Sequence, residues 1–137
     1  MQNHLNQVSH NKKFHDCLNS NFPTNFYDWK TTVIFYISVH CLRALAASKQ
    51  PPIVLGDSHT DARSKTHPRN GIMPVSWNAW DSYQTLREHS NAARYNGFTD
   101  EATFQALWET NYNFCFQIFS GYKSYINNQL RSKNISV

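Results

Sequence analysis

Apolar side chains cover most of a helical circumference in one part of the chain, residues 25–48 (NFYDWKTTVIFYISVHCLRALAAS). Two stripes at steps of three and four residues run along it: Trp29, Val33, Tyr36, His40 and Ala44 form the first, and Ile34, Ile37, Cys41 and Leu45 the second. Because two apolar stripes need partners on two sides, we expect this segment to be the central and most buried helix. Its polar positions are the first places to look for function, and they are Asp28, Ser38, His40 and Arg43.

Amphipathic patterns predict three more long helices and one short helix around it. The long ones are expected over residues 4–20, over residues 77–95 after the N-cap Ser76, and from the N-cap Thr99 to about Leu130; the short one is expected over residues 59–66 after the N-cap Ser58. We expect Asn25 to cap the central helix, and Pro51 and Pro52 to end it. The predicted fold is all-α: an up-and-down antiparallel four-helix bundle in one domain, residues 1–137, with a long second connection that carries the short helix.

Composition supports a folded protein, because 40% of the residues are hydrophobic, 15% are aromatic and only 16% are charged. A net charge of +4 permits an anionic partner. Three cysteines, Cys17, Cys41 and Cys115, lie in apolar helical patterns without a short spacing, so we expect reduced core residues. The polar start and the lack of a membrane-length apolar run predict a soluble, cytoplasmic protein without membrane association.

His59 and Arg63 are the first candidates for chemistry. In the expected short helix they are one turn apart, on one face. An imidazole can take the proton of a ribose 2′-hydroxyl while a guanidinium holds the phosphate charge, and this reaction needs no metal. His40, on the inner stripe of the central helix, is the third catalytic candidate. The structural alternative pairs Arg63 with a carboxylate, places His59 in a helical N-terminus and makes His40 a hydrogen-bonded core residue.

Other polar residues extend or compete with this hypothesis. Candidates for a phosphate-binding or nucleic-acid-binding surface are Arg94, Tyr95, Arg69 and Lys65. A metal site built from His59, Asp61, His67 and His40 is an alternative without zincin-like ligand spacing, and we expect no metal and no cofactor. The histidines of the first helix, His4, His10 and His15, are expected to face solvent.

The last helix carries a surplus of aromatic residues and outruns the others. We expect exposed aromatic surface from Phe114, Phe116, Phe119, Tyr122 and Tyr125. Such a surface suits a symmetric partner, so a homodimer is predicted.

Three separated motifs resemble the HEPN-like helical-bundle family. They are DWKTTVIFYISVHCLRALAA, SHTDAR and YQTLREHSNAARY, and they follow the family's order of a DWA-type helix carrying FYAALH, an SH…R segment and a Y-x-L-x-x-x-S-x-x-ARY stretch, across roughly residues 25–130. The resemblance implies a bundle of four or five helices, often dimeric, in toxin–antitoxin, defence and stress systems, where an antitoxin-like protein can be the partner. Catalytic members of the family are metal-independent RNases.

The chain departs from the family at its catalytic motif. Those RNases use an Arg, four to six further residues and then a His, whereas three residues separate Arg63 from His67 here and one separates Arg87 from His89. The catalytic assignment therefore does not transfer, and enzymatic activity stays open. We carry two main hypotheses: an RNA- or nucleotide-binding protein of toxin or defence type that can include RNA cleavage, and a non-catalytic dimeric interaction module. A His-ligated metal enzyme is the third.

Overall fold

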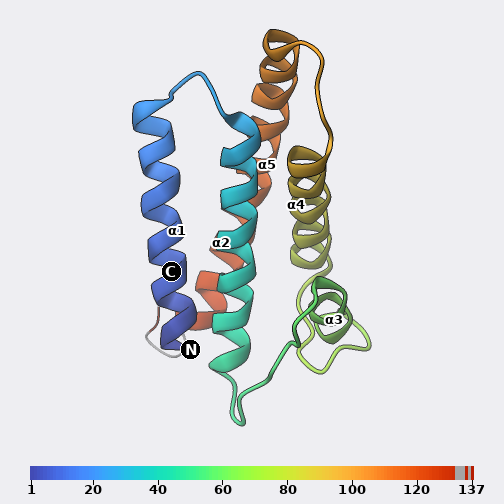
Figure 1. The fold of residues 1–137 in the computed structure, drawn as a ribbon. Helices are drawn as coiled ribbons and strands as arrows, with labels where there is room; N and C mark the ends of the chain where they lie inside the picture. The colour runs from blue at the N-terminus through green and yellow to red at the C-terminus, as the bar shows by residue number, and fades with distance from the viewer. Residues whose placement is uncertain (132–134, 136) are drawn as a thin grey trace.

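The computed structural model describes residues 1–131, 135 and 137, and within them the chain forms five helices (Figure 1). In chain order they are α1 (Gln2–Asn21), α2 (Tyr27–Ala47), α3 (His59–Lys65), α4 (Trp77–Tyr95) and α5 (Glu101–Arg131). No strand occurs among the described residues, so the predicted all-α class is confirmed for this part of the chain. No helix of the described part combines the length and the apolar character that a membrane span requires.

The position of α2 at the centre is confirmed by its neighbours. It contacts α1, α4 and α5, and α4 in turn contacts α5. Successive long helices run in opposite directions (Figure 1). Ile34 and Phe35 are completely buried and Leu42 is nearly so; each large apolar side chain removed from water in this way stabilises the fold by about 1.5–3 kcal/mol. The segment with apolar residues on most of its circumference is therefore the one that the other helices enclose.

Serine residues begin α3 and α4, as predicted. Ser58 Oγ accepts a hydrogen bond from the Asp61 N–H at 3.0 Å, and Ser76 Oγ accepts one from the Ala79 N–H at 3.1 Å. Each bond satisfies one of the N–H groups that a helix leaves unpaired in its first turn. The starts of these two helices are thus fixed by local chemistry that the sequence displays.

The predicted caps of α2 and α5 are wrong. α2 begins after Phe26, whose backbone is left-handed with φ 57°, and the Asn25 side chain accepts a bond from the Phe26 N–H at 2.8 Å instead of capping the helix. The cap of α5 is Asp100, one residue beyond Thr99, and its Oδ2 accepts from the Thr103 N–H at 3.0 Å. A carboxylate is a stronger acceptor than a hydroxyl and is favoured at the positive end of a helix dipole.

The exposed side of α1 differs from the expectation. Of the three histidines expected in solvent, only His10 is exposed. His15 is 6% exposed and its Nε2 lies 2.8 Å from Tyr112 Oη of α5, while His4 is half-buried beside α2. Cys17, expected in the core, is exposed. A hydrogen bond to a residue far along the chain allows a polar ring to enter the core, and spacing within α1 does not reveal it.

The aromatic surface of α5 is smaller than expected. Phe119 and Tyr122 are buried and Tyr125 is half-buried, whereas Phe114 and Phe116 are exposed. The buried rings face the other helices, because α5 packs against both α2 and α4. Two of the five rings assigned to a partner surface therefore belong to the core.

Acidification is expected to weaken the fold through His15. Burial lowers the pKa of His15 below the value of 6.5 for a free imidazole, although Asp16 acts in the opposite direction. Because the folded pKa is the lower one, the stabilising contribution is complete above the unfolded pKa and is lost as the pH falls through the folded pKa. The urea midpoint, measured at about pH 7.5 and about pH 5.5, should fall more in the wild type than in His15→Gln. Equal falls in the two proteins would show that His15 does not carry this dependence.

Candidate functional site

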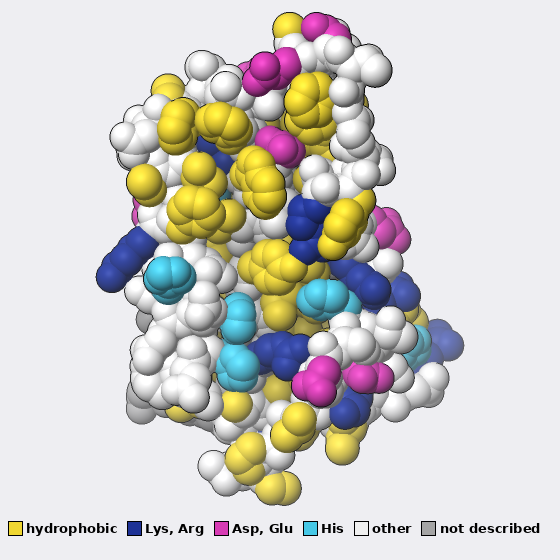
Figure 2. All heavy atoms as spheres, in the orientation of Figure 1, with side chains coloured by type: hydrophobic (Ala, Val, Ile, Leu, Met, Phe, Trp, Pro, Cys, Tyr) yellow, Lys and Arg dark blue, Asp and Glu magenta, His cyan; other side chains and the backbone are white. Residues whose placement is uncertain are grey.

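One face of the molecule gathers histidine and basic side chains across the middle of α2 and beside α3 and α4 (Figure 2). Electrostatic effects connect six side chains, which we call the basic cluster: His4, His40, Arg43, His59, Arg87 and Arg94. They come from four helices, α1 to α4. Acidic side chains lie below the cluster on the same face (Figure 2). The one ion pair among the described residues, His15 with Asp16 at 4.0 Å, lies outside it.

α3 positions His59 against α2 and α4. The imidazole centroid lies 5.1 Å from the Phe35 ring, and Nδ1 lies 2.9 Å from Tyr83 Oη. Burial raises the pKa of Tyr83 to about 12, so its hydroxyl stays protonated. No other hydrogen bond holds the ring within the described part of the chain, so Nε2 is the nitrogen that can meet a ligand.

Burial and nearby arginines favour the neutral form of the His59 imidazole. Burial lowers the pKa of His59, and the positive charges of Arg87, Arg43 and Arg94 lower it further. A neutral imidazole near pH 7 can accept a proton. The charges that shift this pKa are all positive. The site therefore combines a proton acceptor with surrounding cations.

Arg43 and Arg87 are unpaired cations. Both are half-buried, and neither forms a hydrogen bond or an ion pair with the described residues. Arg94 is instead held in place, because it donates to the Tyr36 hydroxyl and to Asn91 Oδ1, the latter at 2.7 Å. A guanidinium presents five N–H donors in a planar fork that matches phosphate and carboxylate oxygens. Arg43 on α2 and Arg87 on α4 thus supply free donors.

His4 and His40 form a pair at the α1 side of the cluster. Their Nδ1 atoms lie 3.1 Å apart. A hydrogen bond at this distance needs one nitrogen to donate and the other to accept, so at most one of the two Nδ1 atoms carries a proton. Burial lowers the pKa of both histidines, and the charge of Arg43 contributes to each shift. The pair therefore adds a largely neutral, polar edge to the cationic centre.

An aromatic pocket adjoins the basic cluster. It has a volume of about 360 Å³ and is lined by Gln7, Asn11, Phe14, Trp29, Thr32, Val33, Tyr36 and His40. Trp29, expected in the core, is 51% exposed here, and Phe14 is 50% exposed. Tyr36 accepts the Arg94 bond and His40 belongs to the cluster, so the pocket and the cluster are continuous. Figure 2 shows hydrophobic side chains gathered above the histidines on this face.

The structure brings together only some of the residues chosen from the sequence. His40, His59 and Arg94 lie in the basic cluster. Arg94 Cζ also lies 5.3 Å from the ring of Tyr95, which is 78% exposed at the rim. His40 comes from the central helix and His59 from the connection after it. The sequence hypothesis required such side chains to meet, and what links these two is the charge of Arg43, which acts on both.

Arg63, Lys65 and Arg69 are engaged elsewhere. The guanidinium carbon of Arg63 lies 3.8 Å from the Trp80 ring centroid, and Trp80 Nε1 donates to the Arg63 carbonyl at 2.8 Å. Lys65 Nζ donates to the Val54 carbonyl at 3.0 Å, and Arg69 lies 5.7 Å from the Trp77 ring. His59 and Arg63 do share the face of α3 that packs on α4. Among the described residues, the side-chain partner of Arg63 is the Trp80 indole and not a carboxylate.

Arg87 and His4 were not among the candidates, and Arg43 was noted only as a polar exception. A signal for the two arginines does exist in the sequence. Arg87 is seven residues before Arg94, and Arg43 is three residues after His40, so each pair shares a helix face. His4 lacks such a signal, because its partner lies on another helix.

The residues proposed for a metal site do not form one. No group of three His, Cys, Asp or Glu side chains suited to a metal ion occurs in the described part of the chain. His67 instead contacts the Trp77 and Trp80 rings at 5.3 and 5.0 Å. The polar chemistry of this face is therefore that of cations, imidazoles and aromatic rings.

Comparison with known proteins gives no relative for this chain. The HEPN-like resemblance thus continues to depend on its three motifs, and the function has to be argued from the geometry of the site. No protein-family model matches the chain, and neither the curated proteins nor the solved structures contain a significant match.

Proposed function

We propose that the chain is a HEPN-like four-helix-bundle protein of toxin or defence type, active in the cytoplasm, that binds RNA or a nucleotide through the basic cluster. The observation that carries the proposal is the pair of unpaired, half-buried arginines, Arg43 and Arg87, beside a neutral His59. Phosphate oxygens match the guanidinium fork, and cations supply most of the affinity for nucleic acid.

The aromatic pocket favours an unpaired base over a duplex. Trp29 and Phe14 offer exposed ring faces, and the amides of Gln7 and Asn11 can bond to base edges. Bases stack on aromatic side chains when they are splayed out of a strand, and a duplex hides those faces. The proposed ligand is therefore single-stranded RNA or a free nucleotide, with its base in the pocket and its phosphate at the arginines.

The same arrangement suits metal-independent RNA cleavage. With the ring proton on Nδ1, which then donates to Tyr83 Oη, His59 Nε2 would take the proton of the 2′-hydroxyl, and the 2′-oxygen would attack the adjacent phosphorus. The new bond closes a 2′,3′-cyclic phosphate, the P–O5′ bond breaks, the leaving 5′-oxygen takes a proton from water, and the hydroxide so formed is neutralised by the proton that His59 later releases. Arg43 and Arg87 would hold the charge that grows on the phosphate oxygens.

Arg87→Ala tests the binding proposal. We expect single-stranded RNA to bind about tenfold more weakly or worse, because a hydrogen bond to a charged group is worth about 1.5–3 kcal/mol. Fluorescence anisotropy with a labelled oligonucleotide measures the change, and thermal melting checks that the fold is retained. Arg69→Ala is the matched control, since Arg69 is exposed and outside the cluster. Equal affinities of the two variants would contradict the proposal.

The second candidate function is a dimeric interaction module without catalysis. Exposed aromatic rings favour it, because Phe14 and Trp29 on one face and Phe114 and Phe116 on α5 are all at least 40% exposed. In that case a second copy or an antitoxin-like protein would cover the aromatic pocket. Trp29→Ala would then halve the mass measured by sedimentation without changing RNA affinity, whereas the RNA proposal requires weaker RNA binding.

A further inference from the structure

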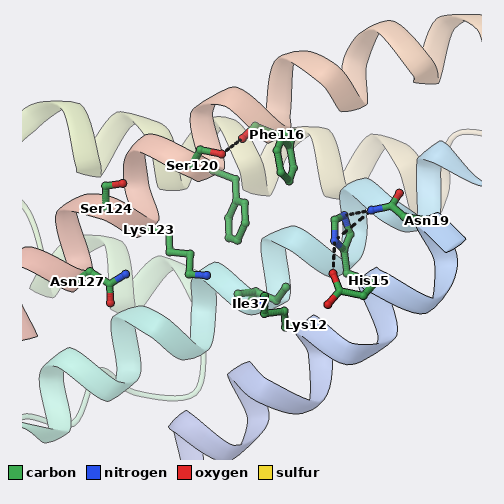
Figure 3. A pocket seen from close by; sticks show the side chains of 11 residues that line it. Lys12, His15, Asn19, Ile37, Phe116, Ser120, Lys123, Ser124 and Asn127 are labelled. Atoms are coloured by element: carbon green, nitrogen blue, oxygen red, sulfur yellow. Dashed lines mark hydrogen bonds and ion pairs between the residues drawn. The ribbon is translucent and has the colours of Figure 1, made fainter. Parts of the chain in front are cut away.

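A groove between α1 and α5 forms a second candidate site. It has a volume of about 430 Å³, with α1 and α5 as its walls and Ile37 of α2 among the residues that line it (Figure 3). None of its lining residues belongs to the basic cluster or to the aromatic pocket. Its size is within the range of small-molecule sites, about 300–1,000 Å³.

An apolar surface in this groove is flanked by polar side chains, which include His15 and Asn19 at one end and Lys123 and Asn127 at the other (Figure 3). Ser124 and the Lys123 amine lie toward one end, and the Phe116 ring lies toward the other, beside His15 (Figure 3). The apolar part consists of Ile37, Phe116 and Phe119. A ligand that fits must therefore combine an apolar part with a polar group that reaches the Lys123 end.

Two lysines give the groove a positive charge. Lys12 on α1 and Lys123 on α5 form no hydrogen bond or ion pair with the described residues. One carboxylate, Asp16, also lines the groove, and it lies 4.0 Å from His15 Nδ1. Burial lowers the pKa of His15, so this ring is largely neutral near pH 7. Two ammonium groups against one carboxylate favour a ligand with a single negative charge.

We propose that this groove binds an aliphatic monocarboxylate. The carboxylate binds at the Lys123 end, where the Ser124 hydroxyl can donate to it, and the alkyl chain covers Ile37, Phe119 and Phe116, while Lys12 on the α1 wall adds to the positive charge of the groove. A nucleic-acid strand is a poor occupant, because it would place a polyanion on only two cations beside an apolar surface. A neutral lipid would leave both ammonium groups without a partner.

Calorimetric titration of the full chain with hexanoate and octanoate tests the proposal. Affinity should rise about fourfold for each added methylene, because each buried one contributes about 0.8 kcal/mol. Octan-1-ol, which lacks the charge, should bind at least about tenfold more weakly than octanoate. The same loss is expected for octanoate in the double variant Lys12→Gln/Lys123→Gln, and the control Lys13→Gln should bind like the wild type.

A second variant keeps the test independent of folding. Ser124 is exposed, so Ser124→Trp can fill the groove at the surface and should abolish octanoate binding with an unchanged melting temperature. Affinity that is independent of chain length, or equal in the lysine variant and the control, overturns the proposal. Competition between octanoate and RNA would also overturn it, because the groove would then belong to RNA. A change of sedimentation mass in Ser124→Trp would do the same, because the groove would then bind a second copy. A wild type that binds no octanoate overturns this proposal and leaves the RNA proposal intact, because the two sites share no residue.

Discussion

Replacing Phe35 by alanine is expected to lower the free energy of unfolding by about 3–5 kcal/mol. The ring is completely buried in α2, and its centroid lies 5.1 Å from the His59 ring and 5.7 Å from the Tyr83 ring. The substitution removes the apolar contacts of the central helix and leaves a cavity below α3. The substitution should therefore also loosen the His59 side chain, which the proposed chemistry uses.

Urea denaturation measures the effect of Phe35→Ala. Phe114→Ala is the matched control, because it removes the same ring from a position that is 50% exposed and should change stability by about 0.5 kcal/mol or less. Since 3–5 kcal/mol is a large part of the stability of a small domain, Phe35→Leu provides a milder variant that keeps the chain folded. If Phe35→Ala and Phe114→Ala cost the same, α2 is not the enclosed helix.

Replacing His59 by alanine is expected to slow RNA cleavage about 10²–10⁴-fold, the usual contribution of a positioned general base. RNA affinity should change only slightly, because Arg43 and Arg87 remain. The wild-type rate should fall as the pH drops through the pKa of His59, since protonation removes the acceptor. Burial and three arginines lower that pKa, so activity should persist to a lower pH than an ordinary imidazole allows.

Product analysis on a labelled oligonucleotide measures the rate and identifies the 2′,3′-cyclic end. His67→Ala is the control, because His67 packs on Trp77 and Trp80 outside the basic cluster. A His59→Ala protein that cleaves at the wild-type rate refutes the role of this imidazole. RNA binding by the wild type with no cleavage at all would refute the catalytic proposal and leave the binding proposal standing.

The central helix and the starts of its neighbours were predictable because the relevant signals are local. Apolar residues on most of a helical circumference indicate a helix that others enclose, and this is the position of α2. Ser58 and Ser76 each accept a hydrogen bond from the backbone N–H three residues later, so the sequence near each serine was sufficient to predict the helix start. The predicted cap of α2 was wrong because Phe26 adopts a left-handed backbone, and phenylalanine has no preference for that conformation.

The composition of the site was only partly predictable because it depends on contacts between helices. His59 and Arg63 do face α4, but the guanidinium of Arg63 packs on the Trp80 ring. Local spacing in α3 cannot show which residue of α4 lies opposite. His15 is buried by a bond to Tyr112, 97 residues away in the chain. The periodicity of apolar residues shows which faces pack, and it does not show which polar side chains of different helices meet.

The salt dependence of RNA affinity tests the central claim that Arg43 and Arg87 bind phosphate. Binding constants for a single-stranded oligonucleotide are measured over a range of salt concentrations for the wild type and for Arg43→Ala/Arg87→Ala. The plot of log K against log salt should be less steep in the variant by about 0.7 for each phosphate contact that is lost. Parallel plots, or a wild type that binds no RNA at low salt, would contradict the claim.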